Sequence, residues 1–477
     1  MAHTGMDVRE TLGITLAAFV LLGASVLFLY HLGREPLQDY DEATYAEVVH
    51  EAFVNHDFLS FTYNHQPYFK KPPLLFWLIG VSEELTPSVE AAARLPSALA
   101  GIALIAVAML FAYEVSGNWY GAALAGAALA TTAPFLETAR ESRFDVLVSL
   151  FIVLTAYFFF RALANPRWFL LFGFAAGLAV LSKSVIAVFA GVFALCIALF
   201  LRRFDWLKNK YFWVGIGVFL LVVLPWHIYE TLRFGNAFWQ SYIGTEVIAR
   251  AQQNLFWTVT ITNGDYISYL GQFAAPWLWV FFAALASIPF WWNKSQKNER
   301  AAVVAFLGTI VSMVAVYFGA VTKAPTYLVP LYPFAALAVG VVASKLFSLQ
   351  QTRFIPALAA VILVAYAVPF CVYNAYHINP YYSTELQLAN EEKIVGQTLA
   401  DREGTAPLYI YKEDNLGDIK FYGQNLHALD LEPGYKPESG SFLVVGSDAT
   451  STLSKDFPDA AFKTLYAGTQ VTLFQTL

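Results

Sequence analysis

Charged residues and cysteines are both scarce in this sequence. Only 13% of its 477 residues are charged, whereas an ordinary soluble domain carries about 25%. The two cysteines, Cys196 and Cys371, lie in apolar runs and have no spaced partner, so neither a disulfide framework nor a cysteine-ligated zinc site is indicated. We interpret both as small hydrophobic residues inside membrane spans.

Motifs for cofactors and nucleic acids are also missing. The sequence has no Walker-type phosphate loop, no Gly-rich dinucleotide turn, no H-E-x-x-H and no C-x-x-C. Its eight histidines show no spacing typical of metal ligands. A divalent metal ion is therefore an alternative that no ligand spacing supports, and no other cofactor is expected. A net charge of −6 and a pI of about 5.8 provide no basic face, which argues against a nucleic-acid partner.

Hydrophobic residues dominate instead, and they predict a polytopic membrane protein. They make up 58% of the chain, and the mean hydropathy is +0.52. A soluble protein of this size would leave large apolar surface in water. A helix that crosses the hydrocarbon needs about 20 apolar residues, and the first such run lacks a small-residue cleavage site, so we expect it to be retained. About eleven runs approach this length: 11–31, 92–114, 118–134, 146–163, 167–182, 185–201, 211–229, 272–292, 301–320, 326–346 and 354–374.

The distribution of Lys and Arg predicts the orientation of these spans. With the N-terminus in the cytoplasm, the inner loops carry many cations and few acids, as the positive-inside rule requires. The sequence therefore predicts a plasma (inner) membrane protein with an extracytoplasmic C-terminus. Charges near the bilayer are usually paired or face a cavity, so we expect one mixed-charge cluster on the outer face, formed with nearby acids by Lys70, Lys71, Arg94, Arg140, Arg143, Lys183, Arg250 and Lys323.

Two regions outside the spans have their own predicted structure. The long outer loop 33–91 contains an amphipathic stretch, 41–55, which predicts a helix on the membrane surface, and an apolar stretch, 74–81, that is too short to cross. Residues 378–477 are richer in charge and contain a helical stretch followed by strand-like runs.

The expected fold class is thus an all-α polytopic membrane domain of about eleven transmembrane helices, residues 1–377, with a small C-terminal α/β extramembrane domain, residues 378–477.

Four segments carry charges that suit chemistry. Asp41 and Glu42 open the amphipathic stretch, where acids can serve as a general base, bind a cation, or simply favour a helix N-terminus. Lys70 and Lys71 precede two prolines, which hold the backbone extended and present the lysines to an anion or to lipid headgroups.

The other two segments lie at later span ends. Asp145 follows Arg140 and Arg143; an acid there caps a helix or joins the arginines in a salt-bridged pocket wall. Lys323 and Tyr327 precede prolines that disturb the next helix and free backbone groups, which makes this segment either a kinked helix or a site wall.

Taken in order, these motifs resemble a known family. They are DE-x-x-YA, YFxKPPL, a basic-acidic turn ending in Asp, LSK, LPWH, E-x-x-x-R and TKxPTYLxPxYP. This order resembles that of the C-type membrane glycosyltransferases, above all the branch of bacterial aminoarabinose–lipid A transferases and protein O-mannosyltransferases. The resemblance covers about residues 10–375. It implies transfer of a sugar, usually with inversion, from a polyprenyl-phosphate donor to a lipid, protein or glycan acceptor on the outer side of the membrane.

The resemblance also assigns residues. The acid of the family's DE pair falls on Asp41, with Glu42 beside it, and the acid at the later span start falls on Asp145. Two departures weaken parts of the match: Lys70 stands where many relatives have an acid, and Val247 stands where many have a histidine after the glutamate of the E-x-x-x-R motif. The remaining matches are Lys71, Arg250, Tyr327 and the nearby Lys323.

These assignments predict a mechanism. Cations that meet the charge growing on the leaving phosphate lower the barrier, and a carboxylate near the acceptor hydroxyl removes its proton. We expect Asp41 to be that base, or to orient the acceptor or sugar if the acceptor is a phosphate, and Asp145 to orient lysines or the sugar. The expected phosphate-binding residues are Lys71, Arg250, Lys323 and Tyr327, with Arg143 in reserve.

Two rival functions predict other patterns. A flippase or transporter of lipid-linked sugars predicts charges near the midplane and paired inverted halves, whereas these charges gather at one face. A non-catalytic scaffold leaves the charges without a reason. The enzyme requires Asp41, Lys71 and Lys323 to meet in one pocket at the non-cytoplasmic rim of the bilayer.

Overall fold

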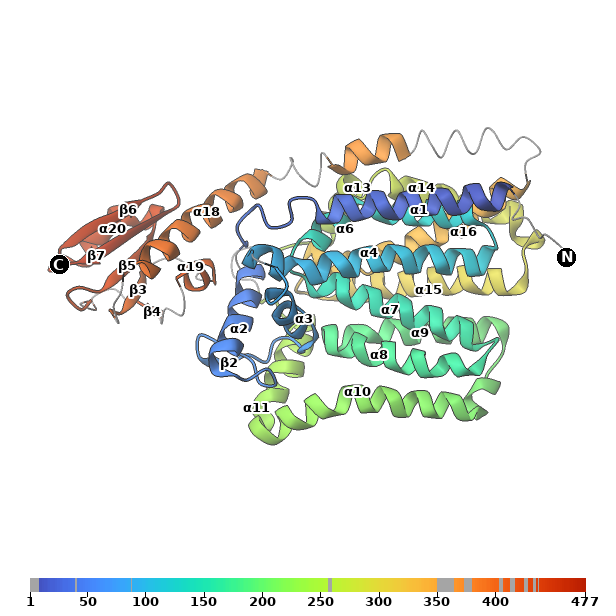
Figure 1. Cartoon of the computed structure of the whole chain (residues 1–477), viewed down its shortest axis with the longest axis horizontal. Helices are drawn as coiled ribbons and strands as arrows, with labels where there is room; N and C mark the ends of the chain where they lie inside the picture. Colours follow the sequence, from blue (N-terminus) through green and yellow to red (C-terminus); the bar gives the residue numbers. More distant parts are fainter. Residues whose placement is uncertain are drawn as a thin grey trace. The chain divides into compact units, whose positions relative to one another are not determined.

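The structure, a computed structural model, consists of a helical bundle and a small mixed sheet (Figure 1). It describes residues 8–38, 41–86, 88–255, 260–349, 364–372, 380–402, 406–411, 417–423, 428–431, 435 and 437–477. The chain divides into two compact units. The helical unit comprises Met1–Tyr30, Phe69–Leu75 and Leu95–His377, and the sheet unit comprises His31–Tyr68, Phe76–Arg94 and Ile378–Leu477.

Most of the described helices lie wholly or mainly in the helical unit, and α4 begins in the sheet unit. Among the described residues, seven helical segments are long and apolar enough to cross a membrane, which agrees with the expected polytopic fold. The helices are α1 (Val8–Leu29), α4 (Val89–Ser116), α5 (Trp119–Ala130), α6 (Ala133–Arg140), α7 (Phe144–Ala162), α8 (Phe169–Lys183), α9 (Val188–Leu201), α10 (Lys210–Phe234), α11 (Asn236–Trp239), α12 (Arg250–Gln252), α13 (Asn263–Phe273), α14 (Trp277–Trp291), α15 (Lys297–Gly319) and α16 (Leu331–Leu349), joined in part by the π-helix η4 (Gln240–Ala249) and the 3-10 turns η1 (Pro166–Trp168), η2 (Ser184–Ala187), η3 (Asp205–Lys208), η5 (Trp292–Lys294) and η6 (Pro325–Leu328).

Some expected spans differ from the observed helices. The run 118–134 is divided between the 12-residue helix α5 and the start of α6. The run 272–292 takes in the end of α13 and all of α14. A bend of 94° separates these two helices, with Pro276, which cannot donate a backbone hydrogen bond, at the break. The last expected run, 354–374, lies mostly outside the described residues. The count of eleven spans therefore stays a prediction.

Two glycine contacts fix the relative direction of α8 and α10. A Cβ on Gly173 would lie 1.9 Å from the carbonyl oxygen of Gly215, and one on Gly177 would lie 2.8 Å from Val222. The residue numbers rise together along both helices, so α8 and α10 run parallel, whereas α9 runs in the opposite direction and packs against α15 (Figure 1). The two expected spans 167–182 and 185–201 thus meet at the turn η2, directly after Lys183.

The close approach of α8 and α10 predicts that glycine-to-alanine substitutions at different positions of these helices change protein stability by different amounts. We expect Gly173→Ala to lower the free energy of unfolding by about 1–3 kcal/mol, because the two backbones must separate. A Cβ on Gly217, also on α10, would meet nothing within 4 Å, so Gly217→Ala should be neutral or slightly stabilising. Thermal unfolding of both purified variants measures the difference, and equal midpoints would contradict the expected effect of the close approach between α8 and α10.

The five-stranded sheet lies in the C-terminal part of the chain. Its order is β4-β3-β5-β7-β6, with β3 parallel to β4 and β5, and with β7 antiparallel to β5 and β6. These strands and their helices are α18 (Pro380–Ala400), β3 (Leu408–Tyr411), α19 (Gly417–Tyr422), β4 (Ala428–Asp430), β5 (Phe442–Gly446), α20 (Ser447–Asp456), β6 (Phe462–Ala467) and β7 (Val471–Thr476). The expected helical stretch and strand-like runs are confirmed.

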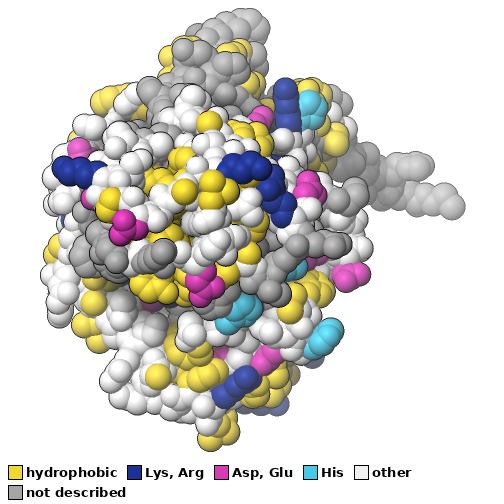
Figure 2. Space-filling model, turned by 90° about the vertical axis from the view of Figure 1, so that its left-hand side faces the viewer, with side chains coloured by type: hydrophobic (Ala, Val, Ile, Leu, Met, Phe, Trp, Pro, Cys, Tyr) yellow, Lys and Arg dark blue, Asp and Glu magenta, His cyan; other side chains and the backbone are white. Residues whose placement is uncertain are grey.

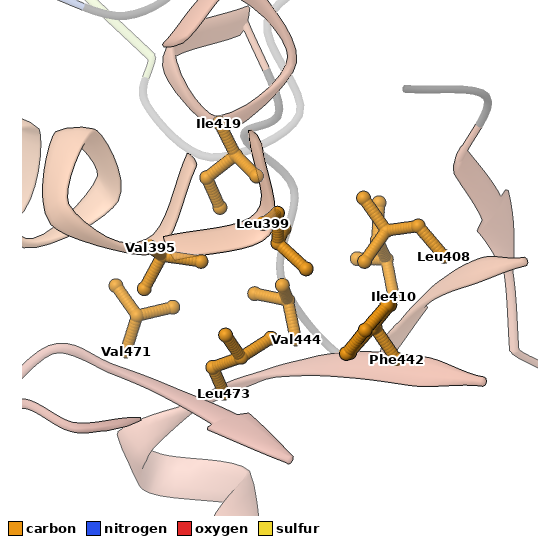
Figure 3. Close-up of a cluster of buried hydrophobic side chains, with 9 residues drawn as sticks. All are labelled: Val395, Leu399, Leu408, Ile410, Ile419, Phe442, Val444, Val471 and Leu473. Carbon is orange, nitrogen blue, oxygen red and sulfur yellow. The ribbon is translucent and has the colours of Figure 1, made fainter. Parts of the chain in front are cut away.

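Alternating side chains give this sheet two apolar faces. Leu408 and Ile410 of β3 join a buried cluster with Val395 and Leu399 of α18 (Figure 3). Tyr409 and Tyr411, which alternate with them, join a second cluster that includes residues of α20. Among the side chains coloured in Figure 2, Lys and Arg are interspersed with Asp, Glu and His.

The amphipathic stretch of the outer loop is helix α2 (Glu42–Asn55), and it is more enclosed than expected. Nine of its 14 residues are buried, including the predicted apolar positions Tyr45, Val48 and Val49. Its acids are buried as well: Glu51 accepts hydrogen bonds from the Thr62 hydroxyl at 2.5 Å and from the His65 N–H at 3.2 Å. These bonds tie α2 to the hairpin β1 (Thr62–Tyr63) and β2 (Gln66–Pro67), and α3 (Leu74–Glu83) follows.

Candidate active site

Glu246 joins two cations that lie far apart in the sequence. Its carboxylate accepts a hydrogen bond from Lys71 Nζ at 3.2 Å and two from the Arg250 guanidinium, each at 3.2 Å. Glu246 comes from η4, a π-helix of ten residues; π-helical turns are rare and frequently mark functional sites. Because all three side chains are largely buried, water screens their mutual attraction less than it would at the surface.

The contacts continue from Arg250 to Asp145. Arg250 donates to the Tyr327 hydroxyl at 3.2 Å, and the Lys183 ammonium lies 5.2 Å from the centre of the Tyr327 ring. Lys183 Nζ in turn donates to Asp145 Oδ1 at 2.5 Å. We call Lys71, Asp145, Lys183, Glu246, Arg250 and Tyr327 the cation cluster. All six belong to the helical unit.

The cation cluster has a surplus of positive charge. It contains three cations and two carboxylates, a net charge of about +1 with both acids ionised. Burial alone would raise the pKa of Glu246, but Lys71 and Arg250 hold that pKa below its ordinary value. Burial alone would lower the pKa of Arg250, but Tyr327 and Glu246 outweigh it and raise that pKa. Glu246 and Arg250 are therefore both charged around neutral pH, and the surplus of positive charge in the cluster favours an anionic ligand.

Backbone hydrogen bonds hold the segment around Lys323 against the residues that follow η4. The N–H of Thr322 donates to the Arg250 carbonyl at 2.9 Å, and the Thr322 hydroxyl donates to the Gln253 carbonyl at 2.6 Å. Lys323 is buried, and its ammonium donates to the Ala320 carbonyl just after α15. Among the described residues no carboxylate pairs with Lys323, so it adds positive charge next to the backbone of the cation cluster.

Aromatic packing positions the π-helix and accounts for the LPWH motif. His227 Nδ1 lies 2.8 Å from the Val223 carbonyl, which leaves Nε2 to accept from the Tyr242 hydroxyl at 3.3 Å. Burial raises the pKa of Tyr242 to about 12, so this hydroxyl keeps its proton. The Tyr242 ring stacks on Phe238 with 5.0 Å between ring centres. The end of α10 thereby supports the helix that carries Glu246.

Arg143 lies in the same turn as Asp145 but has an acid partner of its own. Its Nε donates to Glu141 at 2.8 Å. The Ser97 hydroxyl accepts from the Arg143 N–H at 3.0 Å and lies 3.1 Å from the Arg143 carbonyl, which ties the turn to α4. The expected reserve role of Arg143 in phosphate binding stays a prediction.

The acids of the DE-x-x-YA motif lie in the sheet unit. Asp41 directly precedes α2 and accepts a hydrogen bond from the Tyr45 hydroxyl at 2.7 Å. Glu42 is fully buried, and Arg94 donates to its two oxygens at 2.8 and 2.7 Å. Breaking a buried pair of this kind costs about 3–5 kcal/mol, so Glu42 has a structural role in this unit. Its catalytic role, like that of Asp41, stays a prediction.

The structure thus brings together four of the expected site residues, Lys71, Asp145, Arg250 and Tyr327, in one cluster. Two members, Lys183 and Glu246, were given no role in the site from the sequence, although Lys183 was expected in the charge cluster of the outer face. The sequence did contain a motif that could have identified each of them, because Lys183 ends the LSK motif and Glu246 begins the E-x-x-x-R motif. The expected meeting of Asp41 with Lys71 and Lys323 stays a prediction. Among the described residues, no group of three His, Cys, Asp or Glu side chains is arranged to hold a metal ion.

Several known sequences that match this chain are named as mannosyl or arabinosyl transferases. The family of dolichyl-phosphate-mannose-protein mannosyltransferases matches residues 70–229. The undecaprenyl phosphate-alpha-4-amino-4-deoxy-L-arabinose arabinosyl transferase 2 of Pseudomonas fluorescens is 26% identical over 363 residues, which cover 73% of this chain and 62% of that protein. An uncharacterized protein of Aquifex aeolicus is 27% identical over 326 residues, 67% of this chain and 62% of that protein. The chain thus spans about three-fifths of the length of these relatives.

Solved structures resemble the whole chain. ArnT from Cupriavidus metallidurans bound to undecaprenyl phosphate superposes with a TM-score of 0.74 at 18% identity, covering 97% of both chains. The chain has the C-type glycosyltransferase fold. The Archaeoglobus fulgidus oligosaccharyltransferase is a more distant example, with a TM-score of 0.56 at 11% identity over 98% of this chain and 74% of that one. The expected C-type resemblance and the expected fold class, a polytopic helical domain with a small C-terminal sheet, are confirmed.

Proposed function

We propose that this chain is an inverting glycosyltransferase. It moves a sugar from a polyprenyl-phosphate donor to a lipid, protein or glycan acceptor on the outer side of the membrane. The observation that carries the proposal is the cation cluster, in which residues from distant segments meet around Arg250 with a net positive charge. The likeness to transferases named for undecaprenyl phosphate and dolichyl phosphate supports a lipid-linked donor.

The cation cluster suits the charge that develops in this reaction. As the bond between the sugar C1 and the phosphate oxygen breaks, the electron pair moves to the phosphate, whose charge grows from about −1 to −2. Lys71, Arg250 and the Tyr327 hydroxyl are held in place before the donor binds, so they stabilise that charge without reorganising. Glu246 and Asp145 keep the cations in position, and Lys323 adds a cation beside them.

The acceptor oxygen attacks C1 from the face opposite the departing phosphate, which inverts the anomeric centre. A hydroxyl is a weak nucleophile at neutral pH, and a carboxylate that takes its proton accelerates the attack about 10²–10⁴-fold. We assign this role to Asp41, which is only partly buried at the N-terminus of α2 and accepts a hydrogen bond from Tyr45.

The topology is part of the same proposal. We place the N-terminus in the cytoplasm and residues 378–477, as a separate domain, on the extracytoplasmic side of the inner membrane. The excess of Lys and Arg in the loops that would face the cytoplasm supports this orientation. A cysteine-accessibility map with one cysteine placed in each loop tests it, and labelling of residue 463 from the cytoplasmic side would contradict it.

A proteoliposome assay tests the activity. The purified chain is reconstituted with a polyprenyl-phosphate sugar labelled in the sugar, and a panel of lipid, peptide and oligosaccharide acceptors is added. We expect label to leave the polyprenyl phosphate and to enter one acceptor class, with inverted configuration at C1 by NMR. A flippase would instead carry the intact donor across the bilayer, so translocation without cleavage would overturn the proposal.

A further inference from the structure

The segment that precedes Asp41 is held by one arginine. Arg94, on α4, donates all five N–H groups of its guanidinium: two to the carboxylate of Glu42, at 2.8 and 2.7 Å, and three to backbone carbonyls. The three carbonyls, at distances of 3.1, 2.8 and 2.6 Å, belong to Leu32, Glu35 and Pro36. The chain on both sides of Asp41 is therefore fixed to the start of α4.

A tyrosine of the C-terminal region holds the same segment. The Tyr422 hydroxyl accepts from the N–H of Leu37 at 3.1 Å and donates to the Glu90 carboxylate at 3.0 Å. Lys393 of α18 donates to the same Glu90 oxygen at 2.6 Å, and its ammonium lies 4.8 Å from the centre of the Tyr422 ring. Glu90 lies one helical turn before Arg94 on α4, so both anchors of the segment share one short stretch of helix.

Apolar contacts complete this attachment. Leu37, Ala43, Ala46 and Ala93 form a buried cluster, and Phe421 packs against it. The neighbouring residues Phe421 and Tyr422 thus bind the Asp41 segment by packing and by hydrogen bonding, respectively. All these residues belong to the sheet unit.

We propose that Tyr422 and Lys393 are positioning residues for the transfer reaction: through Leu37 and Glu90 they fix the chain segment that places Asp41. The C-terminal region, residues 378–477, is then part of the catalytic apparatus as well as an outer domain. This inference rests on the proposed function and on Asp41 as the base. A small displacement of a catalytic group can cost up to about 10²-fold in rate, so loss of this anchor should be visible in transfer.

The test uses the full chain with Tyr422→Phe. The variant leaves the ring in place and removes the only hydrogen-bond partner of the buried Leu37 N–H among the described residues. We expect kcat for transfer to fall about 10-fold or more, with the KM for the lipid donor unchanged, because the cation cluster is untouched. Hydrogen exchange, followed by mass spectrometry of peptides covering residues 32–45, should become faster.

Two further variants sharpen the result. Lys393→Met, which keeps the apolar stem, should change kcat and exchange in the same direction as Tyr422→Phe. Tyr466→Phe removes a hydroxyl that has no hydrogen-bond partner among the described residues of the same sheet unit, and it should change neither. Thermal midpoints close to that of the parent protein establish that the variants fold.

The outcomes separate this inference from the proposed function. Faster exchange at residues 32–45 together with full transfer would overturn the positioning role while leaving the transferase intact. Unchanged exchange in Tyr422→Phe would overturn the anchor itself. Absence of transfer in the parent protein, with all acceptors tested, would count against the proposed function, and the exchange measurement would still decide whether Tyr422 holds the segment.

Discussion

Replacing Arg250 with glutamine is expected to lower the rate of transfer by about 10²–10³-fold, the scale of losing one preorganised donor to a developing oxyanion. Arg250 connects the two halves of the cation cluster, since it donates to both Glu246 and Tyr327. Without it, the leaving phosphate loses a cation, and the Tyr327 hydroxyl loses the group that orients it. Initial rates with saturating acceptor at several donor concentrations measure the loss.

Two control variants test whether the loss of transfer is specific to Arg250 and to the shape of its guanidinium group. Arg161→Gln breaks a similar pair, with Glu114 at 2.6 Å, at the other end of α7 from Asp145, and should leave transfer within about 2-fold, since a partly exposed pair contributes little. Arg250→Lys keeps the charge but not the planar fork that reaches two partners, and should retain only part of the activity. Full activity in Arg250→Gln would remove this residue from donor binding.

The fold could be predicted from the sequence wherever one run of residues forms one helix or one strand. The long apolar runs at α1, α4, α7, α10 and α15 set helix lengths directly, because hydrocarbon thickness sets how many residues must be apolar. The short helix α5 and the bend between α13 and α14 depend on how neighbouring helices pack, which a single run does not encode. The burial of Glu42 and Glu51 in α2 also depends on partners from other segments, Arg94 and Thr62, respectively.

The same holds for the candidate site: single residues could be predicted from the sequence, but their contacts could not. Lys71, Asp145, Arg250 and Tyr327 could be selected because charged or polar residues at span ends are unusual, and because the motif order resembles a known family. Their partners could not, since the pair of Lys71 and Glu246 is separated by 175 residues. Glu246 was also obscured by Val247, which departs from the family pattern. Lys183 reaches Asp145 only because α8 runs back alongside α7.

Asp41→Asn is the second change with a large expected effect. Asparagine has nearly the same shape, and its side-chain oxygen can still accept the hydrogen bond that Tyr45 donates to Asp41 at 2.7 Å, but it cannot take a proton from the acceptor. We expect the protein to fold normally and transfer to fall at least about 10²-fold. Because the cation cluster is unchanged, the KM for the lipid donor should stay the same. Steady-state transfer rates and a thermal midpoint provide both measurements.

Asp57→Asn is the matched control, because Asp57 also lies in the sheet unit and accepts backbone hydrogen bonds, from Leu59 and Ser60, each at 3.0 Å. This control variant should leave transfer unchanged.

The loss of transfer in Asp41→Asn depends on the acceptor, so this variant also distinguishes the two acceptor classes. A hydroxyl acceptor needs a base, so Asp41→Asn should be nearly inactive with it. A phosphate acceptor is already ionised, so the same variant should lose less than about 10-fold with it. Normal rates with a hydroxyl acceptor would show that another group removes the proton.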